Sequence, residues 1–196
     1  MDAIADDVRT VVLVEGLSDL AALEALAARR DFELAGAGVA IVAIGGATNI
    51  SRYVEQYGPR GRNLNVGGLC DAGEEPAFRR RLERAGFGND LSREKLEALG
   101  FFVCDRDLED ELIRALGVDA VERVIEREGE LASLRIMQRQ PAQRERRADE
   151  QLRRFIGTRS GRKIRYGKLL AAAVEPDDVP RPLAGMLDWM CARLPS

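Results

Sequence analysis

The amino-acid sequence predicts an α/β fold: a parallel sheet of about four strands with flanking helices, followed by a helical C-terminal segment. Short apolar runs rich in Val, Leu and Ile alternate with helical stretches in the first part of the chain. These runs are apolar throughout, which is typical of strands buried on both faces of a parallel sheet. No strand pattern recurs from Val118 onward. We therefore expect an α/β core over residues 1–117 and a helical extension over residues 118–196 that packs on the core.

Four apolar runs predict the strands of this sheet. The first, residues 10–14, is short and β-branched, and the second, residues 39–44, ends in two glycines. The third run, residues 65–70, is a weaker candidate because it contains two glycines, which indicate tight packing or close approach of another backbone. The fourth run, residues 101–104, is short and ends in a series of acidic residues.

A helix is expected after each strand. The predicted helices of the core are residues 18–30, 49–57, 75–85 and 107–116. Ser18 or Asp19 is the expected N-cap of the first helix, and Asp107 that of the last. Phe78 and Leu82 have the i, i+4 spacing of one helix face.

The C-terminal segment predicts several helices with a basic middle part. These helices are residues 120–127, 130–139, 148–155, 162–173 and 183–194. Between Arg135 and Lys168 the chain has 12 Lys and Arg residues and 3 acidic residues, although its overall net charge is −3. A basic segment beside an acidic body favours an enzyme that acts on a polyanion. A solvated arginine-rich helix face explains the same pattern, and the charge alone leaves both open.

The composition excludes several classes of function. The chain has no histidine, which excludes Ser-His-Asp and Cys-His catalysis. Cys70, Cys104 and Cys191 have no CxxC spacing, so we expect small buried side chains and no zinc site. The sequence has no P-loop motif, no GxGxxG after a strand, and no apolar run of about 20 residues. We therefore expect a cytoplasmic protein with no membrane association, whose chemistry uses carboxylates, Lys, Arg or an oxygen-ligated metal ion.

Acidic residues cluster where the predicted strands end. Glu15 ends the first strand with Asp19 one turn beyond it, Asp71 ends the third, and Asp105, Asp107 and Glu109 follow the fourth. Ligands of parallel α/β sheets bind outside the carboxyl ends of the strands, and hard divalent ions prefer carboxylate oxygens. The pattern thus predicts a Mg²⁺ or Mn²⁺ site for phosphodiester chemistry. Taken singly, Asp19 and Asp107 can equally be helix caps, and Glu15 can simply face solvent.

A glycine turn follows the second strand. Gly45 and Gly46 precede a predicted helix, so free backbone N–H groups there could receive a phosphate. A plain tight turn explains the same residues.

Four segments of the chain resemble motifs of one family. Residues 11–19, an apolar strand followed by Glu15-Gly16 and then Asp19, look like the opening motif of TOPRIM domains. Residues 44–50 resemble the Gly-Gly-x-x-Asn segment of OLD-family (overcoming lysogenization defect) nucleases, and residues 102–112 resemble their Asp-Leu-Glu-rich segment. Residues 161–171 are similar to their C-terminal lysine motif. The four motifs occur in the family's order over most of the chain.

The resemblance implies a TOPRIM/Rossmann-like sheet and a nuclease site with two divalent ions. It implies that Glu15 is a metal ligand and general acid or base, and that Asp19 and Asp71 are further ligands. It assigns Glu109 to the second ion, with Asp107 as a helper. Lys163, carried by the helical extension, would stabilise charge at the scissile phosphate. Lys168 is the alternative if the lysine of the family motif aligns with this later lysine of the segment.

The sequence departs from the family pattern in two ways. The family has Asp-x-Asp at the third strand, whereas this chain has Asp71-Ala72-Gly73, so Glu74 or Glu75 would have to replace the second carboxylate. The family joins an ATPase to this domain, and this sequence contains none, so an ATPase on another chain is a candidate partner.

Two functions fit these observations best. One is a metal-dependent nuclease that acts on nucleic acid, DNA in preference to RNA. The other is a degenerate TOPRIM module that binds nucleic acid or a partner ATPase without cutting. A phosphoacceptor signalling domain fits poorly, because it needs adjacent acids after the first strand and a lysine after a fifth. An α/β enzyme for a small phosphorylated substrate also stays open, as does the choice between monomer and homodimer.

Overall fold

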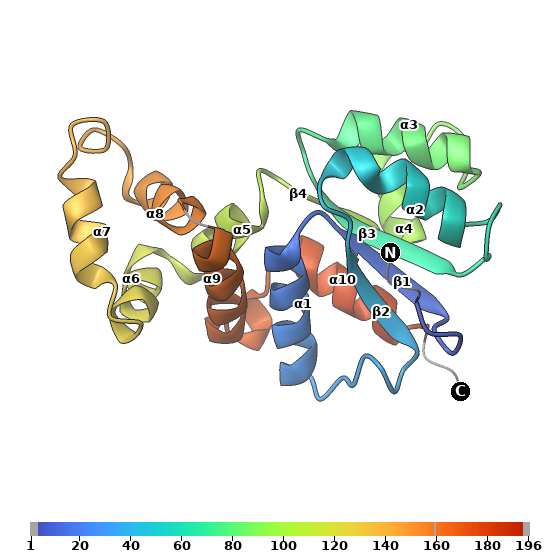
Figure 1. Ribbon diagram of the computed structural model, residues 1–196, viewed down its shortest axis with the longest axis horizontal. Coiled ribbons are helices and arrows are strands. Elements are labelled where there is room, and N and C mark those ends of the chain that lie inside the picture. Colours follow the sequence, from blue (N-terminus) through green and yellow to red (C-terminus); the bar gives the residue numbers. More distant parts are fainter. Residues whose placement is uncertain (1–3, 159, 194–196) are drawn as a thin grey trace.

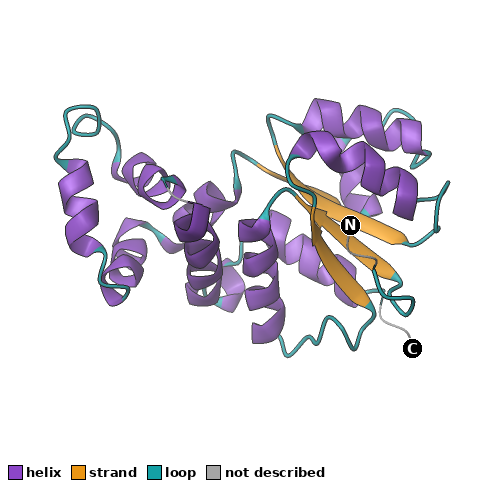
Figure 2. Ribbon diagram, viewed as in Figure 1, coloured by secondary structure: helices purple, strands orange, loops and turns teal. Residues whose placement is uncertain are grey.

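The computed structural model describes residues 4–158 and 160–193 and contains a four-stranded sheet in the order β2-β1-β3-β4. All neighbouring strands are parallel, which confirms the predicted α/β fold. The strands are β1 (Thr10–Val14), β2 (Val39–Ala43), β3 (Asn65–Asp71) and β4 (Phe101–Cys104). Figures 1 and 2 show the sheet at one end of an elongated molecule, with a group of helices beyond its carboxyl edge.

Helices cover both faces of the sheet. The helices of the first part are α1 (Leu17–Arg29), η1 (Ala47–Asn49), α2 (Ile50–Tyr57), α3 (Glu75–Ala85) and α4 (Arg93–Leu99). In Figure 1, α2, α3 and α4 lie on one face, and α1 and α10 (Arg181–Cys191) lie on the other. The strand residues alternate between two cores: Val11 and Leu13 pack in one, whereas Val12 and Val14 pack in the other. A strand buried on both faces must be apolar throughout, which is why its sequence shows no alternation.

Close packing explains the glycines of β3. A Cβ atom on Gly67 would lie 2.7 Å from the Gly100 carbonyl oxygen and 2.8 Å from the Trp189 ring. On Gly68 it would lie 2.6 Å from the Leu13 carbonyl oxygen. The prediction that these glycines allow close backbone approach is confirmed, and it is α10 and the neighbouring strands that come close.

The remaining helices form the group beyond the carboxyl edge. They are α5 (Leu108–Leu116), α6 (Val118–Arg127), α7 (Leu131–Gln138), α8 (Ala148–Gly157) and α9 (Ser160–Ala173), followed by η2 (Pro176–Asp178). Helix α9 packs along α1, and α8 packs against α5 and α9. This packing brings the basic segment next to the strand ends, because α1 and α5 both begin there.

Two details of the predicted elements are wrong. Helix α4 was not expected, although Ser92 caps it by accepting a hydrogen bond from the Lys95 N–H at 3.3 Å. The N-cap of α1 is Gly16, not Ser18 or Asp19. The last helix ends at Cys191, and the expected end at Leu194 lies outside the described residues.

No helix of the described residues combines the length and apolar character that a bilayer span needs.

Candidate active site at the carboxyl edge of the sheet

A cleft of about 390 Å³ lies at the carboxyl edge of the sheet. Residues from both parts of the chain line it: Glu15, Gly16, Leu17, Ser18, Asp19, Gly45, Gly46, Asp71, Asp107, Leu108, Lys163 and Ile164. The cleft thus unites four of the predicted metal ligands with the predicted lysine. Glu109, the fifth predicted ligand, lines an adjoining cavity that shares Asp107 and Lys163 with the cleft.

Glu15 and Asp19 are set by the turn between β1 and α1. The Glu15 carbonyl oxygen accepts hydrogen bonds from the N–H groups of Gly45 and Gly46, at 3.0 and 3.1 Å. The N–H groups of these two glycines are therefore used within a tight turn and are not free to receive a phosphate. Asp19 accepts a hydrogen bond from the Gly16 N–H at 2.8 Å, so it closes the first turn of α1. Burial raises the pKa of Asp19, and the nearby Glu15 adds to this rise.

Asp71 occupies the end of the central strand β3. Burial raises the pKa of Asp71 to about 7, and the charges of Glu15, Asp107 and Asp19 add to the rise. The positive charge of Lys163 acts in the opposite direction and lowers the pKa of Asp71. A carboxyl group crowded by other carboxylates gains most from a cation placed among them.

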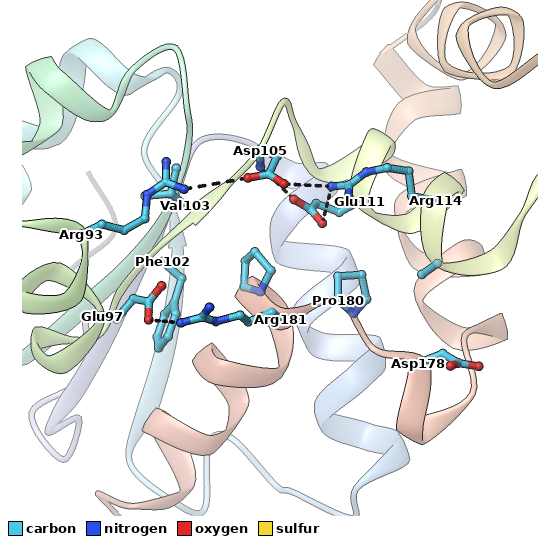
Figure 3. Close-up of a pocket in the computed structure, with 12 residues that line it drawn as sticks. Arg93, Glu97, Phe102, Val103, Asp105, Glu111, Arg114, Asp178, Pro180 and Arg181 are labelled. Atoms are coloured by element: carbon cyan, nitrogen blue, oxygen red, sulfur yellow. Dashed lines mark hydrogen bonds and ion pairs between the residues drawn. The ribbon is translucent and has the colours of Figure 1, made fainter. Parts of the chain in front are cut away.

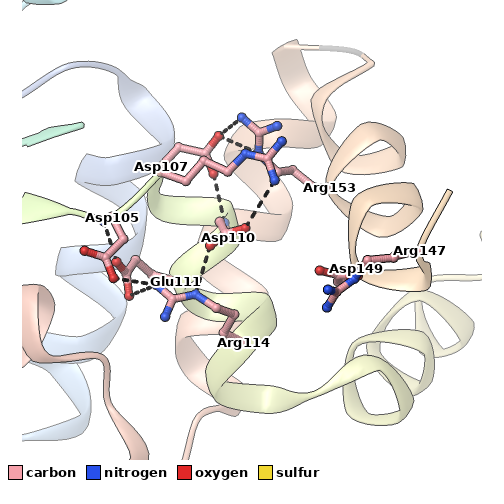
Figure 4. Close-up of polar contacts among 9 residues, drawn as sticks. Asp105, Asp107, Asp110, Glu111, Arg114, Arg147, Asp149 and Arg153 are labelled. Carbon is pink, nitrogen blue, oxygen red and sulfur yellow. Dashed lines mark hydrogen bonds and ion pairs between the residues drawn. The ribbon is translucent and has the colours of Figure 1, made fainter. Parts of the chain in front are cut away.

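Asp107 joins the start of α5 to α8 (Figure 4). Its Oδ1 accepts the Asp110 N–H at 2.9 Å, which confirms it as the N-cap of α5. Its Oδ2 accepts two hydrogen bonds from the Arg153 guanidinium, one of them from Nε at 2.6 Å. Burial acts to raise the pKa of Asp107, but these hydrogen bonds outweigh it and hold the pKa below its usual value.

Glu109 and Lys163 form an ion pair at the mouth of the adjoining cavity. Lys163 Nζ lies 3.2 Å from Glu109 Oε2. The other oxygen, Oε1, is buried and has no hydrogen-bond partner among the described residues. Burial raises the pKa of Glu109, and Lys163 offsets this rise in part. Burial acts to lower the pKa of Lys163, but Glu109, Asp19 and Asp107 raise it, so the amine stays protonated.

Gly167 brings Lys163 to the cleft. A Cβ atom on Gly167 would lie 2.8 Å from the Ser18 carbonyl oxygen, so only glycine lets α9 approach the first turn of α1 this closely. Lys163 lies one turn before Gly167 on the same helix and therefore faces Asp19. Lys168 is exposed and is not among the described residues that line the cleft, which favours Lys163 over Lys168 as the site lysine.

The expected replacement for the missing carboxylate is not in place. The Glu75 carboxylate accepts a hydrogen bond from Arg93 at 2.6 Å and also pairs with Arg79. The hydrogen bond from Arg93 is the main cause of the lowered pKa of Glu75, with Arg79 contributing. Neither Glu74 nor Glu75 is among the described residues that line the cleft. The structure therefore supplies no second carboxylate from this loop.

Asp105 also lies apart from the cleft, contrary to its expected place in the same acidic group. It lines a separate cavity of about 440 Å³ at the edge strand β4 (Figure 3). Its carboxylate lies 3.9 Å from the Arg93 guanidinium and 3.6 Å from that of Arg114. Figure 3 shows Glu97 and Arg181 paired in this cavity as well, so each arginine that lines it has an acidic partner.

Sequence reasoning missed Arg153 as a partner of the site. Arg154 beside it carries the same charge, and only the packing of α8 on α5 selects Arg153. A faint signal existed, because a half-buried N-cap carboxylate such as Asp107 favours a counter-charge, and the basic segment offers one.

The donor chemistry of the site fits hard divalent ions. Carboxylates outnumber cations in and beside the cleft, Asp71 is destabilised as an anion, and Glu109 has an unpartnered buried oxygen. No group of three acidic or cysteine side chains among the described residues is arranged to hold one ion. The reason is that Asp19, Asp107 and Glu109 each point to a partner of their own, namely Gly16, Arg153 and Lys163.

The fold is a four-stranded parallel sheet with Glu15 and Asp71 at the carboxyl ends of its central strands. Residues 8–66 match the family model of the overcoming lysogenization defect protein-like TOPRIM domain. This part of the chain is therefore similar to an OLD-like TOPRIM domain, in line with the resemblance of its motifs to that family.

Solved structures extend this likeness to nearly the whole chain. The C-terminal region of the Xanthomonas campestris pv. campestris OLD protein is 28% identical with a TM-score of 0.69, and the match covers 96% of this chain and 97% of that one. The C-terminal region of the Burkholderia pseudomallei OLD protein is 24% identical with a TM-score of 0.69, covering 95% of this chain and 98% of that one. The latter likeness concerns the fold alone. No curated protein matches the chain.

Proposed function

We propose that this protein is a divalent-metal-dependent nuclease that acts on DNA. One observation carries the proposal: Glu15, Asp19, Asp71, Asp107 and Lys163, from four separate segments, line a single cleft. Structural roles explain some of these residues, since Asp19 and Asp107 also close helix turns. They do not explain Asp71, because a carboxyl group with a pKa raised to about 7 destabilises the fold at neutral pH. Its presence there is expected when a cation compensates for the repulsion.

The residues divide into three roles under this proposal. Glu15, Asp19 and Asp71 would hold one Mg²⁺ or Mn²⁺ ion, and Glu109, helped by Asp107, a second. When bound, the ions would polarise the phosphodiester and favour ionisation of a water molecule. Glu15 is exposed at the cleft and would take up or release a proton during attack. The protonated Lys163 would stabilise negative charge at the phosphate. Its position allows this, because it lines both the cleft and the adjoining cavity.

A second function has its own support. Gly73 stands where the family has an aspartate, and Glu75 is held by Arg93 and Arg79. A site with one carboxylate fewer binds divalent ions more weakly. This favours a module that binds DNA, or an ATPase on another chain, without cutting.

Cleavage of supercoiled plasmid separates the two functions. We expect nicking with Mn²⁺ or Mg²⁺, none with EDTA, and loss of nicking in Glu15→Ala and Asp71→Ala. Asp105→Ala is the matched control, because Asp105 also follows a strand but lies in the other cavity. Equal nicking by all variants would assign the activity to a contaminant. Absence of nicking together with salt-sensitive DNA retention would support the binding module.

The remaining expectations belong to this proposal as well. We propose that the protein works in the cytoplasm, and that the basic segment contacts phosphates of the substrate. Association with an ATPase on another chain, and assembly into a homodimer, are further predictions.

A further inference from the structure

A second cavity of about 260 Å³ continues the cleft on the side of α8. It shares Asp107 and Lys163 with the cleft and is otherwise lined by Glu109, Arg153, Arg154 and Gly157. The last two turns of α8 form its outer wall, because Arg153, Arg154 and Gly157 all belong to that helix. The two cavities thus form one groove with a mostly acidic end on the sheet and a basic end on α8.

The Arg154 guanidinium has no charged partner among the described residues. Some exposed arginines of the extension pair with acids, as Arg135 does with Glu122 and Arg147 with Asp149. Arg154 is exposed, and no described residue forms an ion pair or hydrogen bond with it. A guanidinium that lines a cavity without an acidic partner is suited to a phosphate, which it can bind through two parallel hydrogen bonds.

One carbonyl group at the end of α8 is compensated by side-chain donors. A helix C-terminus carries a partial negative charge on its unpaired carbonyl groups. The Phe155 carbonyl oxygen, however, accepts hydrogen bonds from Arg162 at 3.3 Å and from the Thr158 hydroxyl at 2.7 Å. These donors compensate for part of the negative charge at this helix end.

We propose that Arg154, together with Arg153, forms a subsite for a DNA backbone phosphate that adjoins the reacting one. This inference rests on the proposed function, because the reacting phosphate is placed in the cleft next to Lys163. A strand that lies in the cleft continues past Lys163 into the second cavity, where α8 meets it. The subsite recognises backbone charge and not base identity, so it positions any DNA sequence.

DNA binding without metal tests the subsite independently of cleavage. Fluorescence anisotropy of a short labelled duplex in EDTA, between about 50 and 200 mM salt, gives the dependence of affinity on salt. Loss of one phosphate contact lowers the slope of log K against log salt by about 0.9, and weakens binding roughly five- to tenfold near 0.1 M salt. We expect this change for Arg154→Ala. Arg62→Ala is the control, because Arg62 is exposed and precedes β3, at the opposite edge of the sheet.

Gly157 offers a second test that does not remove an arginine. A Cβ atom on Gly157 would meet no other atom within 4 Å, so both alanine and aspartate fit there. We expect Gly157→Asp to weaken DNA binding, because its carboxylate repels a phosphate in the cavity. Gly157→Ala should bind DNA as the native protein does.

The outcomes separate the subsite from the proposed function. If the native protein binds no DNA, both the subsite and the proposed function fail. If it binds, but Arg154→Ala has the salt slope of Arg62→Ala and Gly157→Asp binds like Gly157→Ala, only the subsite is overturned. Arg154 is then a solvated surface residue.

Discussion

Arg153 Nε donates a hydrogen bond to Asp107 Oδ2 at 2.6 Å and thereby ties α8 to the first turn of α5 (Figure 4). The pair links residues 46 positions apart in the chain, one from the basic segment and one from the acidic strand ends. It also means that one candidate metal ligand is already neutralised. A metal ion at Asp107 must compete with the guanidinium for the same oxygen.

Removing this competitor should strengthen metal binding. We expect Arg153→Ala to bind Mn²⁺ about tenfold more tightly, or about 1.4 kcal/mol, as measured by isothermal titration calorimetry. The same substitution should lower the free energy of unfolding by about 1 kcal/mol, since the pair is half-exposed. Arg154→Ala is the control, because Arg154 does not contact Asp107. Unchanged or weaker Mn²⁺ binding in Arg153→Ala would show that Asp107 is only a helix cap.

The approach of α9 to α1 depends on Gly167. We expect Gly167→Ala to lower the free energy of unfolding by about 1–3 kcal/mol, because its methyl group would collide with the Ser18 carbonyl. In Gly161→Ala, on the same helix, the methyl group meets no atom within 4 Å, so this variant should be more stable by up to about 1 kcal/mol. Urea denaturation measures both. Equal effects would show that helix propensity, and not the contact, determines the result.

Much of this architecture could be predicted from the sequence. The strands were identified because parallel strands are apolar throughout, and Glu15 and Asp71 could be placed together because parallel strands end at one edge. Lys163 is 144 positions from Asp19, and only its resemblance to a family motif placed it. Two interactions could not be predicted: the Arg153–Asp107 pair and the hydrogen bond from Arg93 to Glu75. Both depend on which side of a helix faces its neighbour, and the spacing of residues in the sequence does not determine this.

Glu130 anchors α9 to the other helices of the extension. Its carboxylate accepts a hydrogen bond from the Tyr166 hydroxyl at 2.9 Å and pairs with Arg162 and Arg165. Burial acts to raise the pKa of Glu130, but these partners lower it below its usual value. The stabilisation is therefore present above the pKa of the unfolded chain, about 4.5, and is lost as the pH falls below it.

Replacement of Glu130 tests this dependence. We expect Glu130→Gln to lower the free energy of unfolding by about 1–2 kcal/mol near pH 7, and the difference from the native protein to shrink as the pH falls below about 4. Glu145→Gln, at an exposed acid of the same extension, should change stability by less than about 0.5 kcal/mol. A pH-independent effect of Glu130→Gln would assign the loss to packing.

Asp71 should couple stability to divalent ions. The native state retains the Asp71 proton up to about pH 7, whereas the unfolded chain releases it near the ordinary aspartate pKa of 3.8. The native state thus binds more protons between these values, and the metal-free protein loses stability as the pH rises through them. Mg²⁺ at about 100 times its Kd should restore about 2.7 kcal/mol, or roughly 5–10 °C in Tm.

Two asparagine variants isolate the effect of Asp71. Asp71→Asn should be as stable as the native protein or more so without metal, and should gain nothing from Mg²⁺. Asp105→Asn should keep the full response, because Asp105 lies in the other cavity. Differential scanning fluorimetry with and without Mg²⁺ measures both variants. A Mg²⁺ response that survives in Asp71→Asn would place the ion elsewhere.

Substitution of Gly73 tests whether the missing carboxylate limits metal binding at the site. A Cβ atom on Gly73 would meet no other atom within 4 Å, so an aspartate can be added without strain. Gly73→Asp restores the Asp-x-Asp pattern that the family resemblance leads us to expect at β3. Because divalent-ion affinity rises with the number of carboxylate ligands, we expect Mn²⁺ binding and plasmid nicking to increase at least about tenfold. Gly73→Asn, which adds a side chain of the same size without charge, should leave both near the native level. If Gly73→Asp binds Mn²⁺ more tightly but still does not nick, the groove serves DNA binding, and cleavage is not its function.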